Sequence, residues 1–184
     1  DRMSAYFDED FDAWVGPFVM ASVNTRVVRR SNELLNGAYG ADFRYDEGTV
    51  ISKGAKGFLG ATAVGIGTGA FAGLAALPVT RPLLKRFLPK PGEGPTPEAI
   101  ENGHYHIELR GLHPTDPSKN MTAHVKGDKD PGYGSTSKMI VESALALAQD
   151  DLPVEGGFWT PASAMGDALL SRLPTSAGVT FEIE

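Results

Sequence analysis

Three arginines in one short stretch have the chemistry to hold an anion. Arg26, Arg29 and Arg30 closely follow Asn24, in a segment predicted to be helical. A guanidinium binds a phosphate or a carboxylate through paired hydrogen bonds, and the Asn24 amide is a further donor. A solvated helix face, in which Arg29 pairs with Glu33 four residues later, explains the same pattern without a ligand. The sequence leaves both interpretations open.

A second group of reactive side chains surrounds a proline–glycine turn at residues 130–134. Tyr133 carries a phenol, which can donate a proton to a carbanion formed by hydride addition. Ser135 and Lys138 follow at the start of a predicted helix, where free amide groups can bind an anion. The alternative is an ordinary turn, with Ser135 as the N-cap of the helix.

Three histidines form the only pattern that suggests a metal. His104, His106 and His124 are expected on the polar face of one hairpin, and imidazoles on adjacent strands can hold zinc. The pattern places no carboxylate or fourth ligand beside them, so we expect ordinary surface histidines and no metal site. The sequence has no cysteine, which excludes disulfides, thiolate catalysis and cysteine-based metal sites within it.

Residues 57–77 form an uncharged run with six glycines and six alanines. Part of it, Gly-Ile-Gly-Thr-Gly at 65–69, resembles a dinucleotide-binding loop in composition. That loop would follow a strand, open a helix and precede an acidic residue by about 20 positions. Here the glycines lie inside the run, and the next acidic residue, Glu93, comes only after several prolines. We therefore expect Gly65, Gly69 and Gly73, which share a spacing that lets helices approach closely, to serve packing or membrane contact.

As a helix, the run 57–77 would be about 31 Å long, which matches the core of a bilayer. Basic residues flank it on both sides: Lys53, Lys56, Arg81, Lys85 and Arg86. A spanning helix would put the two flanks of one domain on opposite sides of a membrane, which argues against spanning. Peripheral membrane contact and a helix buried within protein stay open.

The remaining periodicity predicts an α+β fold, with a mixed, largely antiparallel sheet and helices packed on it. Helices are predicted at 18–36, 135–149 and 161–173, and strands at 42–51, 104–112, 121–126 and 179–183. Residues 89–97 are rich in proline and glycine and are predicted to be a loop. We expect one domain over 1–184, with 57–77 as an apolar helical insertion.

The charge distribution excludes one class of partner. The net charge is −6 and the basic residues are scattered, whereas a nucleic-acid surface needs a basic stripe. The sequence begins at Asp1 without the pattern of a signal peptide, so we expect part of a longer chain. The lack of cysteine favours a cytoplasmic location, and the apolar run suggests the inner face of the plasma membrane.

Four stretches together resemble the C-terminal part of saccharopine dehydrogenase-like oxidoreductases, including the trans-acting enoyl reductases of mycobacterial lipid synthesis. They are residues 23–31, residues 89–95, residues 130–134 continuing through Lys138 to 142–144, and residues 156–162 with the terminal 181–182. Their order and spacing, which extend over nearly the whole chain, carry the resemblance.

The resemblance implies an N-terminal Rossmann domain, absent from this sequence, that binds NADP or NAD. This chain would then cover the nicotinamide site, shape the pocket for a lipid or acyl substrate and contribute to a homodimer. The whole enzyme would reduce an enoyl or related group in lipid or glycolipid synthesis, and this part alone would be inactive. A non-catalytic, lipid-surface interaction module of the same fold is the alternative.

Overall fold

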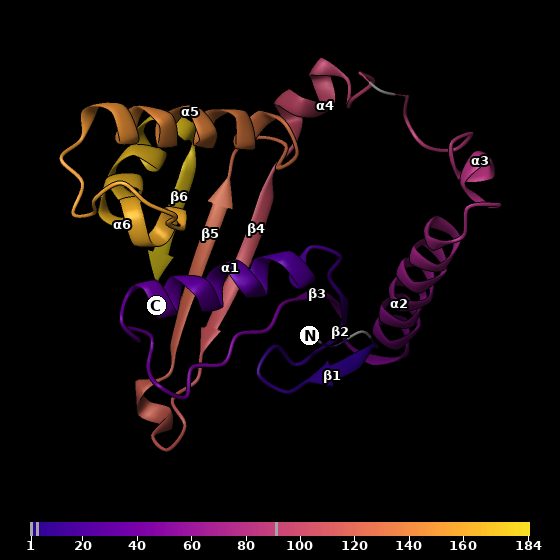
Figure 1. Cartoon of the computed structure of the whole chain (residues 1–184). Helices are drawn as coiled ribbons and strands as arrows, with labels where there is room; N and C mark the ends of the chain where they lie inside the picture. The colour runs from indigo at the N-terminus through magenta and orange to yellow at the C-terminus, as the bar shows by residue number, and fades with distance from the viewer. Residues whose placement is uncertain (1, 3, 91) are drawn as a thin grey trace. The chain divides into compact units, whose positions relative to one another are not determined.

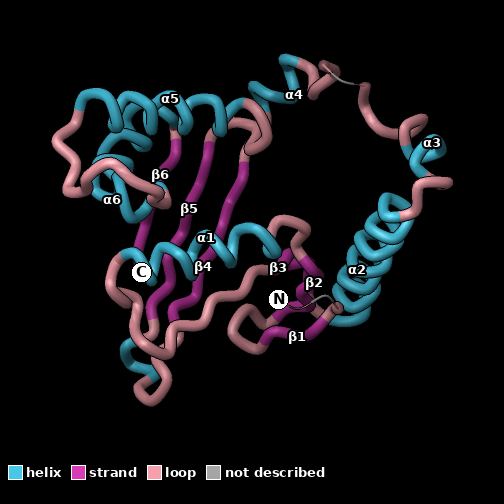
Figure 2. Tube along the Cα trace, viewed as in Figure 1, coloured by secondary structure: helices cyan, strands magenta, loops and turns pink. Residues whose placement is uncertain are grey.

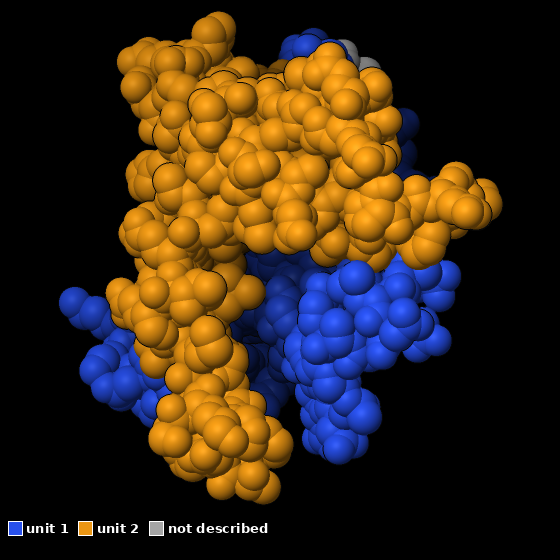
Figure 3. Space-filling view, turned by 90° about the vertical axis from the view of Figure 1, so that its left-hand side faces the viewer, with its two compact units in different colours: residues 1–93 blue, residues 94–184 orange. Residues whose placement is uncertain are grey.

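Two small antiparallel sheets and six helices make up the α+β fold of the described residues, which are 2, 4–90 and 92–184 of a computed structural model (Figures 1 and 2). The chain divides into two compact units, Asp1–Glu93 and Gly94–Glu184, where the sequence predicts one domain (Figure 3). The division falls in the predicted loop 89–97, whose prolines and glycines disfavour regular structure. Pro91 of that loop lies outside the described residues.

The first unit is built on a sheet of order β1-β2-β3. Its strands are Tyr6–Asp8, Ala13–Pro17 and Gly48–Ser52. The predicted strand at 42–51 overlaps only the last of these, and the sequence does not predict the first two. Both missed strands are short and lie in an acidic stretch, so neither shows enough alternation to be recognised.

Helix α1 spans Ala21–Leu34, and the side chains that it buries are small or polar. Thr25 and Ser31 are buried, and each hydroxyl donates to the carbonyl four residues earlier, at 2.7 and 2.9 Å. Val23 and Val27, which lie four residues apart on one side of the helix, are exposed. The helical period therefore predicted the helix correctly but not the side of it that packs.

Helix α2 spans Gly54–Ala76, which confirms the predicted helix at 57–77. Its first half packs closely on the β1–β3 sheet. A Cβ atom at Gly57 would overlap the backbone of Ser52, and Ala61 is fully buried. The ring of Phe58 meets that of Trp14 edge to face at 4.8 Å. The glycine in the first turn lets the helix backbone come this close to the strand.

The second half of α2 makes no such contact. A Cβ atom at Gly67, Gly69 or Gly73 would find nothing within 4 Å. A single short helix, α3 at Arg81–Leu84, follows α2. Figure 1 shows α2 leaving the β1–β3 sheet, with α3 beyond its far end.

The second unit is built on a sheet of order β4-β5-β6, with all pairs antiparallel. The strands are Tyr105–Gly111, Met121–Gly127 and Val179–Ile183, which confirms three predicted strands to within one residue. A 3₁₀ turn, η1 at Pro117–Lys119, lies in the β4–β5 hairpin. A short helix, α4 at Pro97–Asn102, precedes the sheet.

Helices α5 and α6 complete the second unit and are also confirmed at their predicted places. They span Gly134–Gln149 and Pro161–Arg172, and a π-helical turn, η2 at Leu173–Ala177, leads into β6. Leu173, Ala177 and Val179 form one buried cluster, onto which Val125 and Met139 pack. Burial of these apolar side chains joins the two helices and the turn to the sheet.

Two glycine substitutions in α2 are expected to change stability in opposite directions. Gly57→Ala places a methyl group on the Ser52 backbone and should lower the free energy of unfolding by about 1–3 kcal/mol or more. Gly69→Ala meets open space and removes a poor helix former, so it should raise stability by about 0.5–1 kcal/mol. Urea unfolding followed by Trp14 fluorescence, in a Trp159→Phe background, measures both. Equal effects of the two changes would contradict the close packing at Gly57.

Candidate functional site

The carboxylate of Asp130 organises the start of helix α5. Its Oδ2 accepts the backbone N–H of Tyr133 at 2.7 Å and that of Gly134 at 3.4 Å, and its backbone carbonyl accepts from the Ser135 N–H at 2.8 Å. These hydrogen bonds, led by that from Tyr133, hold the pKa of Asp130 below its ordinary value. The amides of Tyr133 and Gly134 are therefore occupied by a carboxylate of the chain itself, and that of Ser135 by a backbone carbonyl.

Tyr133 and Ser135, two of the predicted site residues, lie in different environments. Tyr133 is exposed, and its ring lies against the backbone of Gly94. Ser135 is fully buried, and its hydroxyl shares a hydrogen bond with the phenol of Tyr105 at 3.1 Å. The phenol of Tyr133 is thus accessible to a substrate, whereas the Ser135 hydroxyl connects α5 to β4.

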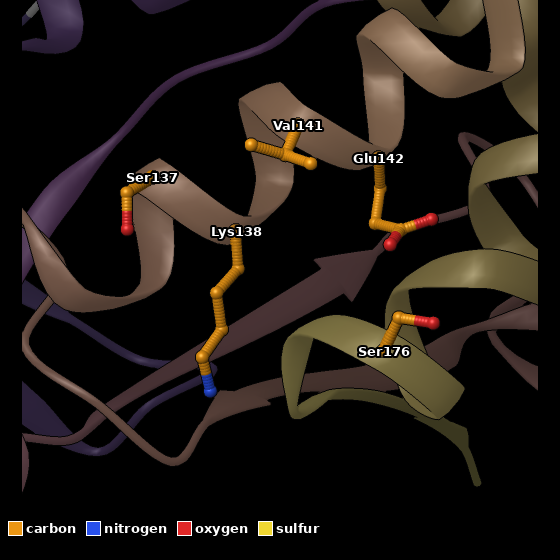
Figure 4. A pocket seen from close by; sticks show the side chains of 5 residues that line it. All are labelled: Ser137, Lys138, Val141, Glu142 and Ser176. Atoms are coloured by element: carbon orange, nitrogen blue, oxygen red, sulfur yellow. The ribbon is translucent and has the colours of Figure 1, made fainter.

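Lys138 lines a surface pocket of about 250 Å³ between α5 and η2 (Figure 4). The other lining residues are Ser137, Val141, Glu142 and Ser176. The ammonium and two hydroxyl groups are donors suited to a small anionic or polar group. Of the residues predicted to bind an anion in this unit, Lys138 is the one that the structure places in a pocket.

Arg172 holds the acidic wall of this pocket. Its Nε and Nη2 donate to the two carboxylate oxygens of Asp150 at 2.8 and 2.6 Å, and its Nη1 donates to Glu142 at 3.2 Å. Asp150 and then Glu142 raise the pKa of Arg172, and Arg172 in turn lowers that of Asp150. Arg172 therefore offsets the negative charge of Glu142, which lines the same pocket as Lys138.

A second pocket, of about 400 Å³, lies in the first unit. Arg29, Phe43, Arg44, Tyr45 and Asp46 line it. The Nη2 of Arg29 donates to the Tyr45 carbonyl at 3.2 Å, and the rings of Phe43 and Tyr45 stack at 6.3 Å. Burial, followed by a hydrogen bond with Glu47, raises the pKa of Tyr45, so its phenol stays neutral at physiological pH.

The predicted cluster of arginines does not act as one clamp. Arg29 enters the second pocket, whereas Arg26 and Arg30 are exposed on α1 and do not line it. The amide of Asn24 donates to Glu47 at 3.0 Å and so faces the following loop. Arg44 takes their place beside Arg29. Periodicity does not show this arrangement, because it predicts Phe43-Arg44-Tyr45 as part of a strand.

The histidine pattern lies in the β4–β5 hairpin, and the glycine pattern lies in helix α2. His106 Nε2 and His124 Nδ1 lie 2.9 Å apart on the β4–β5 face, and no group of three or more potential metal ligands forms among the described residues. Gly65, Gly67 and Gly69 lie within α2, away from any strand–helix junction. They therefore do not form the dinucleotide loop that their spacing resembles.

Comparison with known proteins gives consistent matches. The chain is 45% identical, over 177 residues, to a Mycobacterium tuberculosis (strain H37Rv) protein provisionally named a trans-acting enoyl reductase. It is 42% identical to the trans-acting enoyl reductase of Mycobacterium bovis (strain BCG) and 40% identical to that of Mycobacterium ulcerans. The chain is homologous to trans-acting enoyl reductases.

The homology covers nearly all of this chain but less than half of each relative. The matches cover 90–92% of the chain and 40–41% of the curated trans-acting enoyl reductases. No family model and no solved structure matches the chain. The resemblance to the trans-acting enoyl reductases is thus supported, while the wider resemblance to saccharopine dehydrogenases stays a prediction.

The ion pair between Asp150 and Arg172 is expected to make the second unit sensitive to acid. Since the folded-state pKa of Asp150 lies below its ordinary value, its stabilising effect is present above that value and is lost as the pH falls through the folded pKa. The unfolding midpoint should fall on acidification, and it should fall less in Asp150→Asn. Thermal unfolding between neutral and acidic pH measures this. Asp151→Asn, at the exposed neighbouring position, is the control and should retain the full acid response.

Proposed function

We propose that this chain is the substrate-side part of an NAD(P)-dependent oxidoreductase that reduces an enoyl group on a lipid or polyketide acyl chain. The supporting observation is 40–45% identity, over at least 90% of the chain, to proteins named trans-acting enoyl reductases. Since those proteins are more than twice as long, the whole reaction is assigned to a longer protein. The chain by itself is expected to be inactive.

The residues of this chain do not fit a dinucleotide cofactor. Reduction of a carbon–carbon double bond adds a hydride to one carbon and a proton to the other, and NADPH or NADH supplies the hydride when bound. Dinucleotide binding uses a parallel βαβ unit with a glycine loop between strand and helix, whereas both sheets described here are antiparallel. We assign the cofactor to an N-terminal domain outside this sequence.

Tyr133 is our candidate for the proton donor. The Asp130 carboxylate fixes its backbone at the start of α5, while its side chain is exposed. A phenol held on a rigid element and open to a substrate can protonate the carbon next to the acyl carbonyl after hydride addition. The complete protein would bring the substrate close to the Tyr133 phenol.

Two pockets are our candidates for holding the polar part of the substrate. Lys138 is the cation in the pocket of the second unit, and Arg29 and Arg44 are the cations in that of the first. A phosphate or carboxylate on the group that carries the acyl chain is the chemistry that such cations recognise. Phe43 adds an aromatic surface to the pocket of the first unit, which suits an apolar group next to the anion.

The alternative function is a non-catalytic module that binds a lipid surface. The observation that favours it is the exposed apolar half of α2, which a reaction on a polar substrate does not need. Turnover separates the two: an oxidoreductase consumes reduced nicotinamide, and an interaction module does not.

The protein at its full natural length is expected to reduce the double bond of an enoyl thioester in the presence of NADPH or NADH. Loss of reduced nicotinamide absorbance and a product heavier by two hydrogens would be measured together. The saturated acyl thioester is the control substrate and should consume no cofactor. Failure to bind either nucleotide would contradict the proposal and favour the interaction module.

Tyr133→Phe is expected to lower kcat for that reaction by about 100-fold or more, because general acid catalysis contributes rate factors of this size. KM should change little, since the aromatic ring remains. Tyr39→Phe, at an exposed tyrosine of the first unit, is the matched control. Unchanged turnover in Tyr133→Phe would show that Tyr133 is not the proton donor, but it would not contradict the proposed reaction.

A further inference from the structure

The apolar segment that begins in the second half of α2 has almost no cover within the chain. In the described residues, α2 is the one helix that is long and apolar enough to cross a membrane by length and composition, with a mean hydropathy of 1.5. Only 6% of its apolar window is buried. A helix that is apolar on all sides needs an apolar environment on all sides.

The packing of α2 limits how it can meet that environment. Gly57 and Ala61 hold its first half against the β1–β3 sheet. Residues 65–76 lie beyond this contact, and none of them is buried. As a helix they are about 18 Å long. That length is well short of the roughly 30 Å of a bilayer core, so it suits insertion into one leaflet rather than spanning.

The stretch after α2 adds exposed apolar side chains at helical spacing. Val79 and Phe87 are 83% and 81% exposed, and Leu83 between them is also exposed. Cations alternate with these residues along the chain: Arg81, Lys85 and Arg86. Large apolar side chains with interspersed basic residues are the combination by which peripheral proteins bind membranes.

The charge of the region is opposite to that of the rest of the chain. Residues 48–92 contain six lysines and arginines and no acidic residue, so they carry +6. The whole chain carries −6, which leaves −12 on the remaining residues. A positive, apolar segment on an acidic protein matches an anionic lipid surface, to which juxtamembrane lysines and arginines are attracted.

We infer that residues 65–88 dock on an anionic phospholipid bilayer, with the free half of α2 and the apolar side chains of 79–88 inserted in one leaflet and the cations among the headgroups. A second copy of the chain is the weaker candidate, because a symmetric contact through residues 65–88, which carry Arg81, Lys85 and Arg86, would place +3 against +3. The inference does not depend on the proposed enoyl reduction. If both hold, docking would bring the substrate-side part of the enzyme to a lipid phase.

Flotation of the full-length natural protein with vesicles tests the inference. Vesicles of phosphatidylcholine with phosphatidylglycerol should carry the protein to the top of the gradient, and vesicles of phosphatidylcholine alone should carry much less. High salt should weaken the binding, because headgroup attraction is screened. Circular dichroism and thermal unfolding show that each variant is folded.

Two pairs of variants separate the charge and apolar contributions. Lys85→Gln with Arg86→Gln should lower vesicle affinity by about 20- to 30-fold, and Arg2→Gln with Lys119→Gln, the same charge change at exposed sites elsewhere, should not. Phe87→Ser should also weaken binding. Its control is Phe158→Ser, which removes a side chain that is 98% exposed but lies outside the segment.

Loss of binding in the segment variants together with its retention in the controls supports the inference. It is overturned if the protein does not float, or if segment and control variants float equally. The inference is also overturned if analytical ultracentrifugation shows a dimer that Phe87→Ser dissociates, since a second copy would then cover the segment. Reduction of a soluble enoyl substrate is measured separately. If that reaction fails, the result of the vesicle experiment is still valid.

Discussion

The close contact between the first half of α2 and the β1–β3 sheet is the constraint on which the first unit depends. A backbone-to-backbone approach at Gly57 and a fully buried Ala61 fix the helix by one end only. The residues after this contact keep the same apolar composition, but a Cβ atom at Gly67, Gly69 or Gly73 would meet nothing within 4 Å, and only 6% of the apolar window of the helix is buried. One helix therefore has two roles: its first half belongs to the fold, and its second half presents an apolar surface.

The second unit is stabilised in a different way. Its sheet is covered by α5, α6 and η2 through small apolar clusters, and Arg172 joins two carboxylates on its surface. Paired with Asp150 and Glu142, Arg172 fixes one wall of the pocket and leaves Lys138 as the cation beside it. Pairing of this kind orients the Glu142 carboxylate and neutralises its charge, while the pairing itself does not involve the ammonium group of Lys138.

The function that we propose follows from homology, and the structure limits which part of it this chain performs. The relatives named trans-acting enoyl reductases are more than twice as long as the matched region. Both sheets here are antiparallel, and the glycine repeat lies inside a helix. Cofactor binding is thus better assigned to another part of the protein, and substrate contact and surface docking to this one.

The sequence by itself determined the three strands and the two long helices of the second unit, because regular alternation and clear capping residues such as Thr160 specify local structure. It also determined that the uncharged run 57–77 is helical and that its glycines do not form a nucleotide loop. Only the tertiary structure showed that Ser135 is buried, with its hydroxyl bonded to Tyr105, and that Arg29 lines a pocket with Arg44 rather than with Arg26 and Arg30. Periodicity identifies an element but not the side that packs, since that depends on chain segments distant in sequence.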